Sequence, residues 1–133
     1  MTVVSTVSQV MAKTVWTADI EDSIDKVEEL LNRRRLSAVP VVDTKGEIFG
    51  VISAGDVLRF HLAKRNPKAV RAWEMCTYKP VAVDPETPIE EVARLMIKNK
   101  IHHIIVREKK NGKLCGIVSA LNFVEQYVLK GRI

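Results

Sequence analysis

The spacing of hydrophobic residues along the chain predicts two helices and two β-hairpins. Apolar side chains recur three and four positions apart over residues 24–31 and again over 89–96, which is the spacing of one buried helix face. Runs of β-branched residues flank a short glycine-containing turn over residues 39–52 and 104–118. Such runs are typical of antiparallel hairpins. The alternation of these patterns favours an α+β fold.

Shorter signals predict the elements that complete each set. A second helix is expected after each hairpin, opened by Ser53 in the first case and by Ser119 in the second. A short strand is expected before each first helix, at Val15-Trp16 and at residues 81–83. The segment Thr87-Pro88-Ile89-Glu90 has the spacing of a capping box, with proline at the first helical position.

The chain contains an internal repeat. When it is shifted by 65 residues, Asp19 lies over Asp84 and Ile24 over Ile89; one inserted residue in the second hairpin turn makes the shift 66, which places Gly50 over Gly116. Each half therefore has the order βαββα, and residues 64–69 form the joint between them. A half of about 50 residues has too small a core to fold alone, so the halves should pack together.

Composition narrows the class of protein. The 133 residues are 47% hydrophobic and 28% charged, with a formal net charge of +5, which is typical of a globular domain. No apolar run approaches the roughly 18 residues of a membrane span, and the N-terminus lacks the pattern of a signal peptide. Cys76 and Cys115 form no CxxC motif or zinc spacing, so we expect a reduced, cytoplasmic protein.

The candidate chemistry lies in one motif that occurs twice. It reads Gly50-Val51-Ile52-Ser53-Ala54-Gly55-Asp56 in the first half and Gly116-Ile117-Val118-Ser119-Ala120-Leu121-Asn122 in the second. A serine between a strand and a helix can cap the helix, or can present its hydroxyl and nearby backbone N–H groups to an anion. The carboxylate three residues later can accept hydrogen bonds from a vicinal diol. The local sequence leaves both roles open.

The βαββα order, the PVVD of the first hairpin and the repeated motif together resemble a tandem pair of cystathionine-β-synthase (CBS) domains, also called a Bateman module. The resemblance covers residues 7–62 and 72–130 and departs from the family pattern at Asn122, where aspartate is usual. It implies two CBS repeats packed pseudo-symmetrically into one flat module. It also implies a non-catalytic sensor, a homodimer formed through exposed helix faces, and a separate effector protein that receives the signal.

The resemblance further implies an adenosine-containing regulatory ligand in clefts between the repeats: AMP, ADP or ATP in preference to S-adenosylmethionine. No metal or other cofactor is implied. The first cleft would use Ser53, Asp56, Thr77, Lys79, Val81, Ile101, His102, His103 and Ile104. The second, weaker cleft would use Lys13, Trp16, Leu36, Ser37, Ala38, Pro40, Ser119 and Asn122. The first cleft should bind more tightly, because a charged acceptor forms stronger hydrogen bonds than the amide of Asn122.

Two alternatives remain at this point. Adjacent residues on a strand face opposite sides, so His102 and His103 cannot chelate one metal together; one of them either faces a phosphate or has a structural role.

The basic runs Arg33–Arg35, Lys64-Arg65 and Lys109-Lys110 indicate a nucleic-acid-binding module as the alternative function. The sequence has no P-loop, G-x-S-x-G or metal-triad spacing, so an enzyme is not expected.

Overall fold

The computed structural model describes residues 4–130, which form two compact units. The first-repeat unit comprises residues 16–80. The second-repeat unit comprises residues 81–130 together with residues 4–15 from the beginning of the chain. The boundaries of the units therefore differ from those of the repeats in the sequence. The segment that precedes each repeat belongs to the unit formed by the other repeat, and we call these the exchanged segments. No helix within residues 4–130 is long and apolar enough to cross a membrane.

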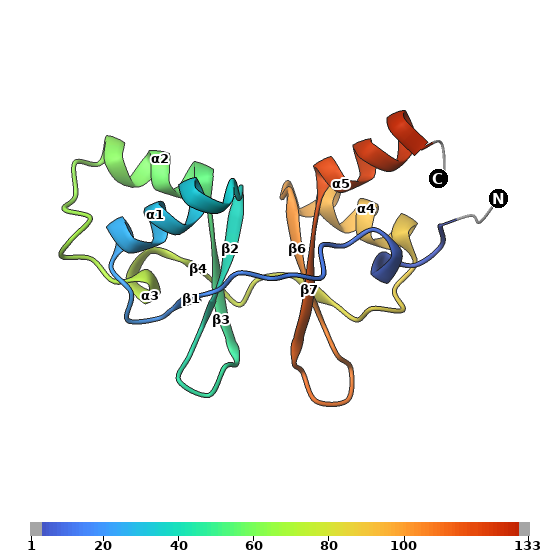
Figure 1. Ribbon diagram of the computed structural model, residues 1–133, viewed down its shortest axis with the longest axis horizontal. Helices are drawn as coiled ribbons and strands as arrows, with labels where there is room; N and C mark the ends of the chain where they lie inside the picture. The colour runs from blue at the N-terminus through green and yellow to red at the C-terminus, as the bar shows by residue number, and fades with distance from the viewer. Residues whose placement is uncertain (1–3, 131–133) are drawn as a thin grey trace. The chain divides into compact units, whose positions relative to one another are not determined.

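The first-repeat unit is a four-stranded sheet with helices on one side (Figure 1). The strand order is β1-β2-β3-β4; β1 runs parallel to β2 and the other neighbours are antiparallel. Its elements are β1 (Ala18–Asp19), α1 (Ile24–Arg34), β2 (Ala38–Val42), β3 (Ile48–Ser53), α2 (Ala54–Leu62), α3 (Ala72–Met75) and β4 (Thr77–Tyr78).

The second-repeat unit has the same plan around a three-stranded sheet in the order β5-β6-β7. Strand β5 is parallel to β6, which is antiparallel to β7. Its elements are the 3-10 helix η1 (Val7–Gln9), β5 (Ala82–Val83), α4 (Ile89–Asn99), β6 (His103–Arg107), β7 (Leu114–Ser119), α5 (Ala120–Val124) and the π-helical turn η2 (Glu125–Lys130). The predicted α+β class is confirmed, with βαββα order in both repeats.

Strand register shows that the two repeats are equivalent residue by residue. Val41 pairs with Gly50 in the first hairpin, and Val106 pairs with Gly116 in the second. At the other end of the hairpins, the partners are Ala38 with Ser53 and His103 with Ser119. The shift between the repeats is 65 residues before the turn and 66 after it, so the inserted residue lies in the turn and leaves the pairing unchanged.

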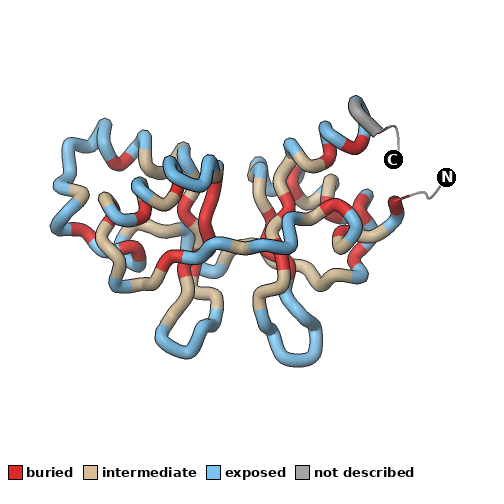
Figure 2. Tube along the Cα trace, in the orientation of Figure 1, coloured by how far each residue is buried: buried red, intermediate tan, exposed pale blue. Residues whose placement is uncertain are grey.

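Each sheet forms its core against the apolar face of the helix that precedes the hairpin. Buried residues of α1 pack with β2, β3 and Phe60, and those of α4 pack with β6, β7 and Phe123. Figure 2 shows these buried stretches on the strands and on the inner helix faces. Both helices end in a left-handed residue, Arg35 and Lys100, whose N–H groups close the last turn. The periodic pattern therefore identified both helices and the faces that they bury.

Two local predictions are wrong. The first strand lies at Ala18–Asp19 and not at Val15-Trp16, because Ala18 is buried and pairs with Val41 while Trp16 lies 38% exposed. Helix α4 begins at Ile89 with Pro88 as its N-cap, and no side-chain cap bond forms at this end. The backbone of Thr87 is held instead by the turn at Asp84 and by the N–H of Val7, so its side chain is not positioned to cap the helix.

The exchanged segments bind the second strand of each hairpin. Strand β4 pairs with β3, where Tyr78 lies opposite Gly50. In the other unit, Ala12 and Ile117 exchange two backbone hydrogen bonds of 2.9 and 3.2 Å. A segment from before each repeat thus adds to the sheet of the other repeat.

Glycine is required where each exchanged segment crosses its hairpin. A Cβ atom on Gly50 would lie 2.6 Å from the carbonyl oxygen of Thr77 and 2.6 Å from Sγ of Cys76. A Cβ atom on Gly116 would lie 3.1 Å from the carbonyl oxygen of Ala12 and would overlap Sδ of Met11. The repeated glycines therefore allow close approach of two backbones.

Replacing Gly50 with alanine should lower the free energy of unfolding by about 1–3 kcal/mol, since the new methyl group must displace β4. Gly55→Ala is the matched control, because its nearest neighbour at 3.5 Å is the flexible end of Arg59. That substitution should leave stability unchanged or raise it by roughly 0.5 kcal/mol. Urea denaturation measures both; equal effects of the two substitutions would contradict the close-approach role of Gly50.

Candidate functional site

The repeated serine motifs form reciprocal caps at the starts of α2 and α5. The N–H of Asp56 donates to Oγ of Ser53 at 3.2 Å, and the N–H of Ser53 donates to Oδ2 of Asp56 at 2.8 Å. Ser119 and Asn122 form the same two bonds at 3.3 and 2.8 Å. The predicted N-caps at both serines are confirmed. The motif thus fixes the geometry of the strand-to-helix junction in each repeat.

The carboxylate of Asp56 also binds an arginine on its own helix. Nη2 of Arg59 lies 2.6 Å from Oδ1 of Asp56, and the side chains are 71% and 18% exposed respectively. Each carboxylate oxygen carries two lone pairs, so Asp56 can still accept hydrogen bonds from a ligand. Arg59 was not among the predicted site residues, although its place three residues after Asp56 on a helix was a usable signal. The equivalent residue of the second repeat is Glu125, so the charges at the two motifs differ.

Each motif lies beside the first strand of its own hairpin. The N–H of Ala54 donates to the carbonyl of Ser37 at 2.9 Å, and Ala38 is the register partner of Ser53. In the second repeat, the N–H of Ala120 donates to the carbonyl of His102 at 2.9 Å. His103 is the register partner of Ser119.

Within each unit, the structure therefore groups some of the predicted residues. Ser53 and Asp56 lie with Ser37 and Ala38, whereas Ser119 and Asn122 lie with His102 and His103. The clefts expected from the sequence combine these sets the other way round, across the two units. That combination stays a prediction.

Thr77 and Lys79 also belong to the first-repeat unit. Thr77 pairs with Val51, and the N–H of Lys79 donates to the carbonyl of Phe49 at 3.3 Å. Both residues are exposed. The neighbouring Cys76 thiol has a pKa raised above its ordinary value, first by burial and then by the negative charge of Asp56. Because Val51, the partner of Thr77, lies two residues before Ser53 on β3, the β4 edge lies near the Asp56 motif.

Because side chains alternate along a strand, the remaining predicted residues on the hairpins lie on opposite faces of their sheets. Ile104 is fully buried in the core of the second-repeat unit, and Val39 occupies the equivalent place in the first. Pro40 follows Val39 and so points to the opposite face of its sheet. The residue equivalent to Pro40 is Ile105, which the sequence analysis missed. Applying the 65-residue shift to Pro40 would have identified it.

The guanidinium group of Arg34 stacks on the ring of Trp16. The guanidinium carbon of Arg34 lies 3.8 Å from the ring centroid, an arrangement typical of a cation–π contact. Nη1 of Arg33 lies 3.4 Å from Oε1 of Glu29. Two arginines of the basic triplet thus have partners within the unit, so the structure adds no support to a nucleic-acid surface there. Leu36 is half-buried and Lys13 is exposed.

An apolar hollow of about 370 Å³ lies beside the second motif. Ile101, His102 and Ala120 line it, together with Met96 and Phe123. The carbonyl of Val81 accepts the N–H of Ile105 at 3.2 Å and so orders the adjoining edge of β6. Among residues 4–130, no group of three or more His, Cys, Asp or Glu side chains is placed to hold a metal ion.

Comparison with known proteins shows the family. The family model described as "CBS domain" matches residues 7–63 and 70–128. The chain therefore belongs to the CBS-domain family and contains a tandem pair of these domains, as the resemblance implied.

Individual relatives cover nearly the whole chain. The uncharacterized protein YlbB of Bacillus subtilis is 30% identical over 113 residues, covering 80% of this chain and 75% of YlbB. A putative signal-transduction protein with CBS domains from Burkholderia ambifaria superposes with a TM-score of 0.86 at 27% identity, covering 96% and 97% of the two chains. The structure of CBSX2 in complex with AMP has a TM-score of 0.79 at 27% identity, covering 96% and 98%.

Proposed function

We propose that this chain is a non-catalytic regulatory module that binds an adenine nucleotide, AMP, ADP or ATP in preference to S-adenosylmethionine. The observation that carries the proposal is the Ser-x-x-Asp/Asn motif, which forms the same reciprocal cap at the strand-to-helix junction of both repeats. The similarity to CBSX2, whose structure contains AMP, supports this choice of ligand. The nucleotide would bias the shape of the module and thereby signal to a separate effector protein in the cytoplasm.

In the first-repeat site, the ribose hydroxyls donate to the carboxylate of Asp56, and Oγ of Ser53 lies at the start of the same helix. The carboxylate suits this task because it is mostly buried and already oriented by the N–H of Ser53 at 2.8 Å. Arg59 is the nearest cation and is mostly exposed, so its guanidinium can turn from Asp56 to the phosphate. Thr77 and Lys79 form the edge of this site that lies next to the Asp56 motif.

In the second-repeat site, Ser119 and Asn122 take the positions of Ser53 and Asp56. We assign His102 and His103 to this site, because their backbone lies directly against Ser119 and Ala120. A histidine N–H then supplies the phosphate contact that Arg59 supplies in the first repeat. The combination expected from the sequence, in which the histidines serve Asp56, stays the alternative, and the coupling experiment below distinguishes the two.

We further propose that the module is a homodimer that meets its copy through α4 and α5. Ile97 on α4, Leu121 and Val124 on α5, and Tyr127 on the following turn η2 are large apolar residues that are 80%, 66%, 49% and 56% exposed. Monomeric proteins rarely expose contiguous apolar surface of this kind. Identical chains close most simply about a twofold axis.

Asp56→Ala should weaken AMP binding by about 1.5–3 kcal/mol, the range for a lost charge-assisted hydrogen bond. Asp25→Ala is the matched control, since Asp25 also lies in the first turn of a helix but outside the motif. Isothermal titration with AMP, ADP, ATP and S-adenosylmethionine measures the loss and ranks the ligands. A folded Asp56→Ala protein with unchanged affinity for all four would refute the ribose assignment.

The double substitution His102→Ala with His103→Ala should weaken AMP binding severalfold and leave adenosine binding nearly unchanged, because only AMP carries a phosphate. Its effect should be non-additive with Asn122→Ala and additive with Asp56→Ala, since groups that contact one ligand are coupled. Titration of the combined variants measures both couplings. Coupling to Asp56 alone would restore the cross-repeat combination and refute our grouping.

Light scattering of the purified chain should give the mass of two chains. Leu121→Glu with Val124→Glu should shift that mass to one chain, because two carboxylates would then face the copy's apolar surface. Lys110→Glu, in the exposed turn after β6, changes the charge away from these helices and should leave the mass unchanged. A dimer that survives the double substitution would show that another surface forms the interface.

A further inference from the structure

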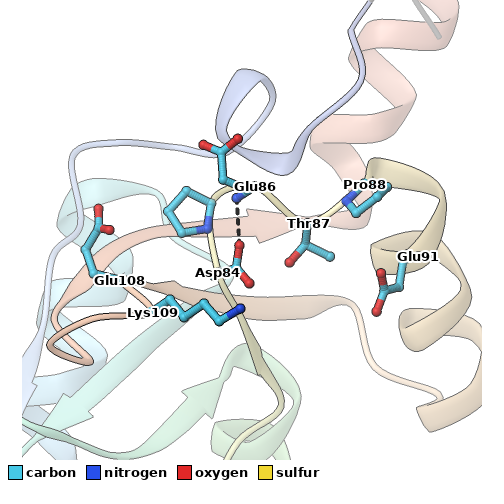
Figure 3. Close-up of a pocket in the computed structure, with 8 residues that line it drawn as sticks. Asp84, Glu86, Thr87, Pro88, Glu91, Glu108 and Lys109 are labelled. Carbon is cyan, nitrogen blue, oxygen red and sulfur yellow. Dashed lines mark hydrogen bonds between the residues drawn. The ribbon is translucent and has the colours of Figure 1, made fainter.

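A polar hollow of about 480 Å³ lies in the second-repeat unit, away from the serine motif (Figure 3). It is formed by the loop after β5, the first turn of α4 and the turn between β6 and β7. The residues that matter for its chemistry are Asp84, Glu86, Thr87, Glu91, Glu108 and Lys109. An adjoining hollow shares five of these six residues and extends to Arg107 and Gly112.

The charges around this hollow are mostly negative and have no internal partner. Four carboxylates and one ammonium group, that of Lys109, belong to the residues that line it. None of these five side chains forms an ion pair with another described residue. One oxygen of Asp84 accepts the N–H of Glu86 at 2.9 Å, which holds the loop in shape. In Figure 3, Lys109 extends below Asp84, whereas the carboxylates of Glu86 and Glu108 point away from Lys109.

Thr87 provides an independent sign of a ligand. The residue is only 8% exposed, and its Oγ1 forms no hydrogen bond with any described residue. In Figure 3, the hydroxyl points into the hollow on the side of Asp84 and Lys109. Among the described residues, Oε1 of Gln126 is the buried side-chain oxygen without a partner; Oγ1 of Thr87 is instead open to the hollow, where it can exchange hydrogen bonds with a bound molecule.

The first repeat fills the equivalent place with its own cation. Asp22 and Lys26 stand at the positions of Thr87 and Glu91. The carboxylate of Asp22 accepts the N–H of Asp19 at 2.9 Å and lies 3.3 Å from Nζ of Lys26. In the second repeat, Glu91 stands in the place of Lys26. Thr87, whose hydroxyl forms no hydrogen bond with a described residue, stands in the place of Asp22. The second repeat therefore has no cation at these two positions, and the ammonium group of Lys109, from another element, lines the hollow instead.

We propose that this hollow binds a small organic polycation, with ammonium groups that donate to Oγ1 of Thr87 and to the carboxylates of Glu91, Glu108 and Asp84. A single metal ion fits less well, because no three acidic side chains in residues 4–130 converge to hold one. A hollow of this size instead suits a small organic molecule. Lys109 then acts as a built-in competitor, whose ammonium group must move aside when the ligand binds.

Titration with spermidine at low salt and without nucleotide tests the proposal. Glu91→Gln should weaken binding roughly fivefold to tenfold. Glu90→Gln removes the same charge one residue away, from a side chain that pairs with Arg94 at 3.7 Å and does not line the hollow, and should have little effect. Lys109→Met should strengthen binding, whereas Lys110→Met should do so much less.

Thr87→Val separates a ligand role from a structural one. Because the hydroxyl has no partner to lose, valine should leave the unfolding midpoint unchanged or raise it, while spermidine binding weakens. Equal effects of Glu91→Gln and Glu90→Gln would show non-specific attraction and overturn the proposal. Full displacement of spermidine by equimolar Mg²⁺ would identify a metal site and overturn it as well. A Thr87→Val protein that is destabilised but binds spermidine normally would show a structural role for the hydroxyl and would also overturn the proposal.

Discussion

The whole arrangement depends on two glycines that allow one backbone to cross another at close range. At Gly50, a Cβ atom would collide with the carbonyl oxygen of Thr77; at Gly116, it would overlap the side chain of Met11 and press on the carbonyl oxygen of Ala12. Because that approach is open, residues 77–78 complete the first sheet and Ala12 pairs with Ile117 beside the second. The capped junctions after β3 and β7 follow a few residues later on the same strands, so their positions are set by the same crossing.

The two repeats share a backbone and differ in charge. Pairing and capping are equivalent from the hairpins through the serine motifs, so the framework at both junctions is the same. The side chains on that framework have diverged: Asp56 with Arg59 in one repeat corresponds to Asn122 with Glu125 in the other. Lys26 likewise corresponds to Glu91. Duplication thus preserved the geometry while each copy acquired its own electrostatic character.

Sequence reasoning succeeded where local rules decide the structure. Helical spacing, β-branched runs and the serine caps depend on neighbouring residues, so they identified α1, α4, both hairpins and both N-caps. It failed where distant residues decide. The first strand formed at Ala18 because Val41, far along the chain, offered a partner there. Arg34 on Trp16 was missed because the two residues are far apart along the chain. Arg59 on Asp56 is the exception, since its helical spacing was a local signal that could have been used.

The exchange of segments also imposes an order on folding during synthesis. Residues 16–80 contain every strand and helix of the first-repeat unit, so all of its elements are present once β4 has left the ribosome. Residues 4–15 emerge earlier but belong to a unit whose hairpin is made last. Residues 4–15 must therefore wait, with Val7 and Val10 without their core, until β7 appears. A nascent chain halted before residue 117 would expose these valines to chaperones or to other nascent chains.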